Sequence, residues 1–189
     1  MVQNGNVFKE AVMINIIEKK MMKNISLAVA FIVSTVSFAQ VAIEKPMIDG
    51  TSTILDFNNV AGNTKGLILP STSGVTTGAL VNGTFIFDVT DKKVKVYEND
   101  VWKPLSDAGD LGTITLNNAP ERGKGVIIGA PTSDADGVLI LESLNKAMIL
   151  PQITTPHLNV KSPYPGMICY DVTSRSLAVF DGSVWNYWK

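Results

Sequence analysis

Residues 88–105, DVTDKKVKVYENDVWKPL, and residues 171–188, DVTSRSLAVFDGSVWNYW, align position for position without a gap. The same offset of 83 places Gly83 opposite Gly166. Upstream, KGLILP from Lys65 matches KAMILP from Lys146 at an offset of 81. Self-similarity on this scale indicates one structural unit used twice. The two copies are either tandem small domains or the halves of one pseudo-symmetric domain.

The repeated stretch predicts three strands in each copy. Short runs rich in β-branched and aromatic residues alternate with polar turns: TFIFDVT, VKVYE and VWKPL in the first copy, and MICYDVT, LAVFD and VWNYW in the second. The last turn holds Asn99 and Asp100 in one copy and an Asp181-Gly182 step in the other. These residue types tolerate the left-handed backbone that tight hairpins require. Each copy is therefore expected to form a β-meander.

The first strand of each meander is apolar at consecutive positions, as FIF and MICY show. A strand with one solvated face alternates apolar and polar residues, whereas a strand covered on both faces does not. We therefore expect the other repeat or another subunit to cover the second face. The fold class predicted is all-β, with two tandem repeats that are compatible with an intertwined or trimeric assembly.

The segment ISLAVAFIVSTVSFAQ, after Lys23, has the features of a secretory signal peptide. Ser37 and Ala39 occupy the small-residue positions of a cleavage site, so residues 21–39 are predicted to be removed. A retained anchor is the less favoured alternative, because the apolar run is shorter than the roughly 20 residues that span a bilayer. Residues 1–20 do not resemble the start of a signal peptide, and we interpret them as an over-long N-terminal extension.

The remaining chain divides into repeat 1 (40–106), a linker (107–125) and repeat 2 (126–189). The linker is rich in Gly, Asp and Asn and is predicted to hold one short strand, TITL, from Thr113. Residues 40–189 contain more acidic than basic side chains, which argues against a nucleic-acid partner. The charged fraction of the whole chain, 17%, is low, which suits a secreted β protein. Cys169 is the single cysteine, so no internal disulfide is expected.

The residues that could support chemistry have simpler structural interpretations. His157 is the only histidine, so a multi-histidine zinc site cannot form, and no nucleophile motif offers it a triad. It lies after Pro156 in a segment expected to be a loop. Asp88 and Asp171 recur at equivalent positions and are predicted to cap the turns that follow them. Neither catalysis nor a cofactor is expected.

Two other stretches lead to the same expectation. SDADG from Ser133, with Glu142 after it, has some of the oxygen ligands of a calcium loop, but a turn is favoured because strand residues follow it. Cys169 aligns with Ile86 and is predicted to pack in the core as a small apolar residue.

Four aromatic residues are the candidates for contact with a partner or a glycan. If Trp102 and Trp185 are exposed, they form two equivalent platforms suited to carbohydrate. The favoured alternative is that they fold back over Tyr97 and Phe180 and close the meander. Tyr187 and Trp188 have no aromatic counterparts in the first copy, so they either dock a partner or complete the core of the last strand.

The second copy resembles a repeat of secreted proteins of the Bacteroidetes and, in its meander half, repeats of phage tail-fibre proteins. The residues that carry the resemblance are Gly129, Pro131, LILES from Leu139, KAMILP from Lys146, Thr154, Thr155, Gly166, Asp171, Thr173 and FDGSVW from Phe180. The first copy matches less well. Its Thr76 and Thr77 stand at a different distance from the Leu-Pro, and Glu98-Asn99-Asp100 replaces the Asp-Gly.

The resemblance implies a building block of fibres or surface layers, often trimeric, with no catalytic residues. Many relatives continue into a self-cleaving chaperone domain, whose catalytic centre has no counterpart in this sequence. We therefore expect an exported structural or adhesive component located at the cell surface, outside the cell or in the periplasm. Expected partners are further copies of the chain, with a trimer favoured, and a cell-surface or polysaccharide ligand, with membrane contact only through the signal peptide. The alternatives are a monomeric carbohydrate-binding module and, less favoured, a hydrolase.

Overall fold

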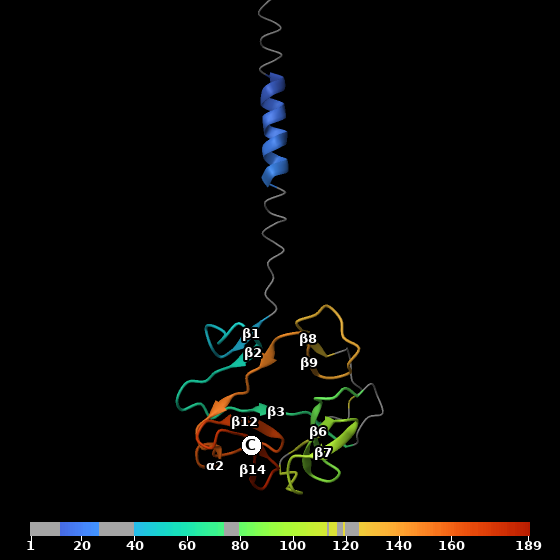
Figure 1. The fold of residues 1–189 in the computed structure, drawn as a ribbon, viewed down its shortest axis with the longest axis vertical. Coiled ribbons are helices and arrows are strands. Elements are labelled where there is room, and N and C mark those ends of the chain that lie inside the picture. The colour runs from blue at the N-terminus through green and yellow to red at the C-terminus, as the bar shows by residue number, and fades with distance from the viewer. Residues whose placement is uncertain (1–11, 27–39, 74–79, 113, 117–118, 120–124) are drawn as a thin grey trace, which may run out of the picture. The chain divides into compact units, whose positions relative to one another are not determined.

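A computed structural model of the chain is shown in Figure 1. It describes residues 12–26, 40–73, 80–112, 114–116, 119 and 125–189. The chain divides into two units, Met1–Phe38 and Ala39–Lys189. In the first unit, residues 12–26 form a helix whose side chains are all exposed, and residues 27–39 of the expected signal peptide lie outside the described part. Within the described residues, no helix has the length and apolar character needed to cross a bilayer.

The second unit is mostly β, and both repeats use the same order of elements. Each has a parallel strand pair, two very short strands and an antiparallel meander. In the first repeat these are β1 (Val41–Ile43), β2 (Thr53–Phe57), β3 (Leu67–Ile68), β4 (Ser71–Thr72), β5 (Phe85–Asp88), β6 (Lys93–Glu98) and β7 (Val101–Pro104). In the second they are β8 (Val126–Ile128), β9 (Leu139–Leu141), β10 (Ala147–Met148), β11 (Gln152–Ile153), β12 (Met167–Asp171), β13 (Ser176–Phe180) and β14 (Trp185–Trp188), with α2 (Pro156–Asn159) after β11.

The six predicted meander strands are confirmed. β5, β6 and β7 pair antiparallel in order, and so do β12, β13 and β14. The turn before β7 places Asn99 and Asp100 at φ 50° and 60°, and the turn before β14 places Gly182 at φ 99°. These are the left-handed conformations that the turn residues were expected to supply.

The two repeats exchange strands. β3 of the first repeat pairs with β12 of the second, and β10 of the second repeat pairs with β2 of the first. The chain therefore forms a sheet β1-β2-β10, a sheet β11-β12-β13-β14 extended by β3, a sheet β4-β5-β6-β7 and a pair β8-β9. Two-residue strands are too short to be stable alone, so the repeats are interlocked halves of one unit.

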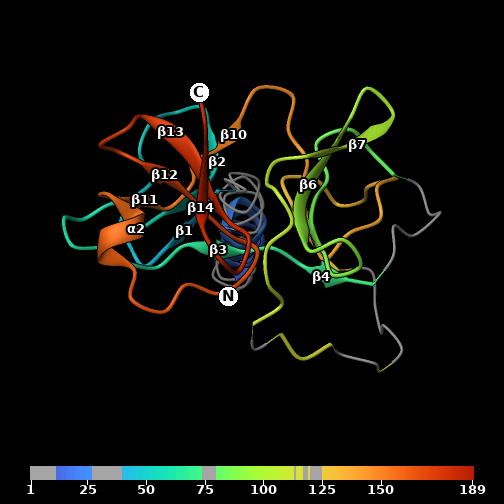
Figure 2. The ribbon, with the colours of Figure 1, turned by 90° about the horizontal axis from the view of Figure 1, so that it is seen from below.

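The main core lies between the two meanders, which stand side by side in Figure 2. Phe87 and Val94 of the first meander pack with Ile168 and Val179 of the second. A second cluster covers the opposite face of β12 and β13 and is made of Ile153, Val160, Met167, Cys169, Ala178 and Phe180. The expectation that β12 is covered on both faces is thus confirmed, and the other repeat covers one of them.

Two local expectations were wrong. Residues 114–116 of the linker form no strand, and Thr113 lies outside the described residues. The N–H of Ile114 donates to the carbonyl of Leu111 in a turn, so it is not available to a strand ladder. The segment after Thr155 is not a loop but the helix α2. Pro156 at its start has the fixed φ that suits a first helical turn, and the N–H of Val160 donates to its carbonyl.

Candidate interaction surface

Trp102 on β7 and Trp185 on β14 occupy equivalent places. The Trp102 ring lies 5.3 Å from that of Tyr97, and the Trp185 ring lies 5.4 Å from that of Phe180, centroid to centroid. Both tryptophans are half-buried. The expected folding back over the preceding strand is therefore confirmed, while one part of each indole remains available to solvent.

The indole N–H groups of two tryptophans differ. Trp188 donates from Nε1 to the carbonyl of Leu105, at 2.5 Å, and so ties β14 to the residue that follows β7. Nε1 of Trp102 is buried, and among the described residues it has no hydrogen-bond acceptor. Trp188 is therefore an anchor between the repeats, although its ring is exposed.

Tyr187 and Trp188 are both exposed, but they do not form one platform. Successive residues of a strand point to opposite faces. Tyr187 points toward α2, where its hydroxyl lies 2.8 Å from Nδ1 of His157 and the two rings meet edge to face. Burial, together with the negative charge of Asp171, raises the pKa of Tyr187. The expected aromatic cluster at the end of β14 thus becomes two separate contacts, one on each face of the sheet.

The repeated aspartates cap turns, as predicted. Asp171 accepts hydrogen bonds from the N–H groups of Thr173 and Thr155, at 2.9 and 3.0 Å, and from the hydroxyl of Ser174, at 2.6 Å. Burial alone would raise the pKa of Asp171, but these hydrogen bonds outweigh it and the pKa is lowered. Each oxygen of this carboxylate therefore has a structural partner.

Asp88 has the same turn bond but a different second partner. Its carboxylate accepts from the N–H of Thr90 at 2.9 Å and pairs with the ammonium of Lys95 at 2.8 Å. Burial opposes ionisation here too, yet Lys95 and Thr90 lower the pKa of Asp88. Both carboxylate oxygens of Asp88, like those of Asp171, therefore have partners that hold the local turn.

The other candidates for chemistry are also engaged. Ser133 donates its hydroxyl to Glu142 and accepts the N–H of Ala135, which is a turn arrangement. In the part of the chain that the structure describes, no three acidic, histidine or cysteine side chains gather as metal ligands would. Cys169 is fully buried, and burial followed by the charge of Asp171 raises its pKa to about 12. Its thiol is therefore un-ionised at neutral pH, as a core residue would be.

One buried ion pair was not singled out from the sequence. Asp56 on β2 is fully buried and contacts the ammonium of Lys45 at 2.7 Å and the N–H of Asp49 at 2.7 Å. The signal was present as an acidic residue inside the apolar strand TILDF. This pair fixes the loop between β1 and β2 and is a structural element.

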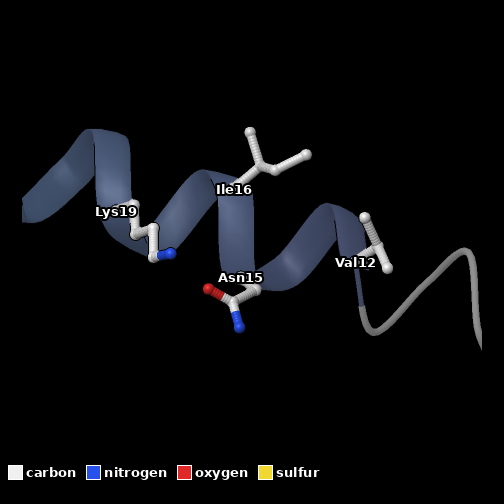
Figure 3. Close-up of a pocket in the computed structure, with 4 residues that line it drawn as sticks. All are labelled: Val12, Asn15, Ile16 and Lys19. Atoms are coloured by element: carbon white, nitrogen blue, oxygen red, sulfur yellow. The ribbon is translucent and has the colours of Figure 1, made fainter.

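Two hollows on the described surface are shallow. One lies along the helix over residues 12–26 and is lined by Val12, Asn15, Ile16 and Lys19, which share one side of that helix (Figure 3). The other lies where β9 leads into β10 and includes Ile54, Gly129, Glu142 and Leu144. Both are open hollows on the surface of the described residues.

Comparison with known proteins gives a match for the second repeat. Residues 127–189 match the family model described as a phage tail like trimerisation region. The match spans the second repeat and includes Trp185, Tyr187 and Trp188, whereas Trp102 lies outside it. A search of the curated proteins and a search of the solved structures found no match. The chain therefore has phage tail-fibre-like character, which supports a structural role and association into a trimer.

Proposed function

We propose that this chain is an exported structural component of a fibre or surface assembly that acts as a homotrimer and has no catalytic activity of its own. The match of residues 127–189 to a trimerisation region carries the proposal. The strand exchange also supports it, because β3 and β10 join the two repeats into one structural unit.

A non-catalytic role agrees with the state of the titratable groups. Asp88 and Asp171 use their oxygens to hold turns, and the Cys169 thiol is buried with a raised pKa. General acid–base or nucleophilic catalysis needs a group that can reach a substrate. The features of a signal peptide in residues 21–39 support export to the surface, the medium or the periplasm.

An adhesive function is the second part of the proposal. The exposed Tyr187 and Trp188, together with the half-exposed Trp102 and Trp185, offer aromatic area to a glycan or a cell surface. The rival is a monomeric carbohydrate-binding module built on the two equivalent tryptophans. It is favoured by one observation, the repeated placement of a tryptophan beside an aromatic residue in both meanders.

Light scattering on purified Gln40–Lys189 tests the proposal. We expect the mass of three chains, because closed symmetric association is the property of a trimerising component. A monomer would overturn it and favour the binding module. In that case, saccharide binding that disappears in Trp102→Ala and Trp185→Ala would establish the rival. The intact mass of the exported chain tests export by the signal peptide, and we expect that chain to begin at Gln40.

A further inference from the structure

The short strand before each Leu-Pro, β3 in the first repeat and β10 in the second, has two edges that can form backbone hydrogen bonds. β10 uses one of these edges. The N–H of Ala147 donates to the carbonyl of Ser52 at 2.8 Å, and the N–H of Ile149 donates to the carbonyl of Leu55 at 2.9 Å. The odd-numbered positions of this segment therefore hold it on β2 of the first repeat.

β3, the counterpart of β10 in the first repeat, uses the opposite side. The N–H of Leu69 donates to the carbonyl of Gly166 at 3.0 Å, and Leu67 lies opposite Ile168. At the repeat offset of 81, these residues correspond to the even-numbered positions of the β10 segment. Among the described residues, each copy of the strand thus leaves one side that the other repeat does not use.

The unused side of β3 is marked by Ile68. In an antiparallel pair, every second residue is bonded to the partner strand and the residues between them turn their N–H and C=O groups away. Ile68 lies between the bonded positions 67 and 69, and it is the counterpart of Ile149, whose N–H holds β10 in place. Ile68 is 48% exposed. Within the described residues, β3 pairs with β12 alone.

A complementary unused edge lies on β9. Leu139 lies opposite Val126 in the second repeat as Leu55 lies opposite Val41 in the first, so Leu139 is the counterpart of Leu55. β9 bonds β8 through its even-numbered residues, as the bond to the carbonyl of Val138 shows. Leu139 therefore directs its backbone groups to the other edge, where none of the described strands pairs. Leu139 is 42% exposed, whereas Leu55 is 1% exposed.

The turn after β9 carries a further sign of a missing neighbour. Leu144 is fully exposed there. Its counterpart in the first repeat, Asn63, donates from Nδ2 to the carbonyl of Gln152 at 3.1 Å and so contacts the second repeat. Leu144, an apolar residue, is thus exposed at the position where Asn63 of the first repeat contacts the second repeat. Val138, just before β9, and Leu139, its first residue, are exposed apolar residues as well.

We propose that the free side of β3 in one chain pairs in parallel with the free edge of β9 in a second copy of the chain, reproducing between chains the contact of β10 with β2. The N–H of Ile68 would donate to the carbonyl of Leu139, as that of Ile149 does to Leu55. The contact joins two different surfaces, so it is heterologous and three chains close it into a ring. The inference rests on the proposed trimer and says which surfaces form it.

Two single substitutions and their mixture test this contact. A lysine on an edge strand blocks pairing with another strand, so Ile68→Lys and Leu139→Lys each remove one half of the contact. Each purified variant is expected to show one third of the wild-type mass by light scattering. An equimolar mixture is expected to give the mass of two chains, because one variant keeps the β9 edge and the other keeps the β3 side.

Val184→Lys is the matched control. Val184 is an exposed apolar residue in the turn before β14 and belongs to neither β3 nor β9, so this variant is expected to keep the wild-type mass. Near-ultraviolet circular dichroism shows whether each variant is folded. If Leu139→Lys or Ile68→Lys does not fold, Leu139→Glu or Ile68→Glu, which also place a charge on the edge, replaces it.

The outcomes separate this inference from the proposed function. A trimeric wild type whose folded Ile68 and Leu139 variants also remain trimers overturns the edge contact and leaves the proposed function standing. A mixture that stays monomeric also overturns it, because complementary halves must associate. A monomeric wild type removes the proposed function and the contact together.

Discussion

The two repeats share an element order but not an environment, and the difference is clearest at two pairs of equivalent residues. Leu55 on β2 is buried between two neighbouring strands, whereas Leu139 on β9 has a neighbour on one edge. Phe87 on β5 is 0% exposed, whereas its counterpart Tyr170 on β12 is 37% exposed. The sequence pattern of a repeat therefore defines its strands. The neighbours that the repeat has within the folded chain decide which of its residues become core.

The largest expected effect is at that aromatic pair. Phe87→Ala is expected to lower the free energy of unfolding by about 3–5 kcal/mol, because it leaves a cavity between the meanders. Tyr170→Ala is expected to cost about 1 kcal/mol, since much of its ring is already in water. Urea denaturation measures both. Similar losses at the two positions would show that the repeats are equivalent in packing after all.

The next effect concerns the glycines that precede the meanders. Gly166 and Gly83 both have positive φ, 81° and 95°, so alanine is strained at either position by about 1–2 kcal/mol. A Cβ at Gly166 would lie 2.9 Å from Cβ of Phe87, whereas one at Gly83 would meet nothing within 4 Å. Gly166→Ala is therefore expected to cost about 1–3 kcal/mol more than Gly83→Ala. Thermal unfolding of the pair tests this, and equal melting temperatures would contradict it.

The next prediction concerns the turn-capping aspartates and how the free energy of unfolding depends on pH. The pKa values of Asp171 and Asp88 are lowered in the folded chain. Their contribution is therefore fully present above the unfolded value of about 3.9 and is lost as the pH falls through the lower folded value. Asp171→Asn is expected to cost about 1–2 kcal/mol at pH 7, and the difference from wild type should shrink below pH 4. Denaturant midpoints between pH 7 and pH 2 measure it. A difference that stayed constant with pH would rule out this account.

The smallest effect is expected at two indole nitrogens. Trp102→Phe removes an N–H that has no acceptor among the described residues, so it should change stability by less than about 0.5 kcal/mol. Trp188→Phe removes the bond to Leu105 and is expected to cost about 1 kcal/mol. Chemical denaturation resolves the two if each is measured against wild type in the same series. A larger loss for Trp102 would indicate an acceptor, such as water, at its Nε1.

The meanders could be predicted from sequence because their signals are local. Alternating runs, turn residues such as Asn99 and Gly182, and the duplicated Val-Trp all lie within a few residues of the bonds they determine. The folding of Trp102 over Tyr97 and the turn caps of Asp88 and Asp171 follow from the same short-range logic.

An intertwined arrangement was among the expectations, but which strands exchange could not be predicted. Two-residue strands such as β3 and β10 have no periodicity, and their partners lie far along the chain. The four-residue helix α2 and the split of Tyr187 from Trp188 also depend on packing between distant elements. The prediction that Tyr187, Trp188, Trp102 and Trp185 contact a partner or a glycan remains a prediction.

The exchange of β3 and β10 also bears on how the chain acquires its structure in time. Leu55 pairs with Met148 and Ile68 pairs with Met167, so each contact closes a loop of roughly 100 residues. Contacts of such separation slow folding, because the entropy of loop closure must be overcome before the contact forms. During synthesis, the first repeat emerges complete in sequence but without the strand that finishes its sheet. It reaches its native form only after residues of the second repeat have been made.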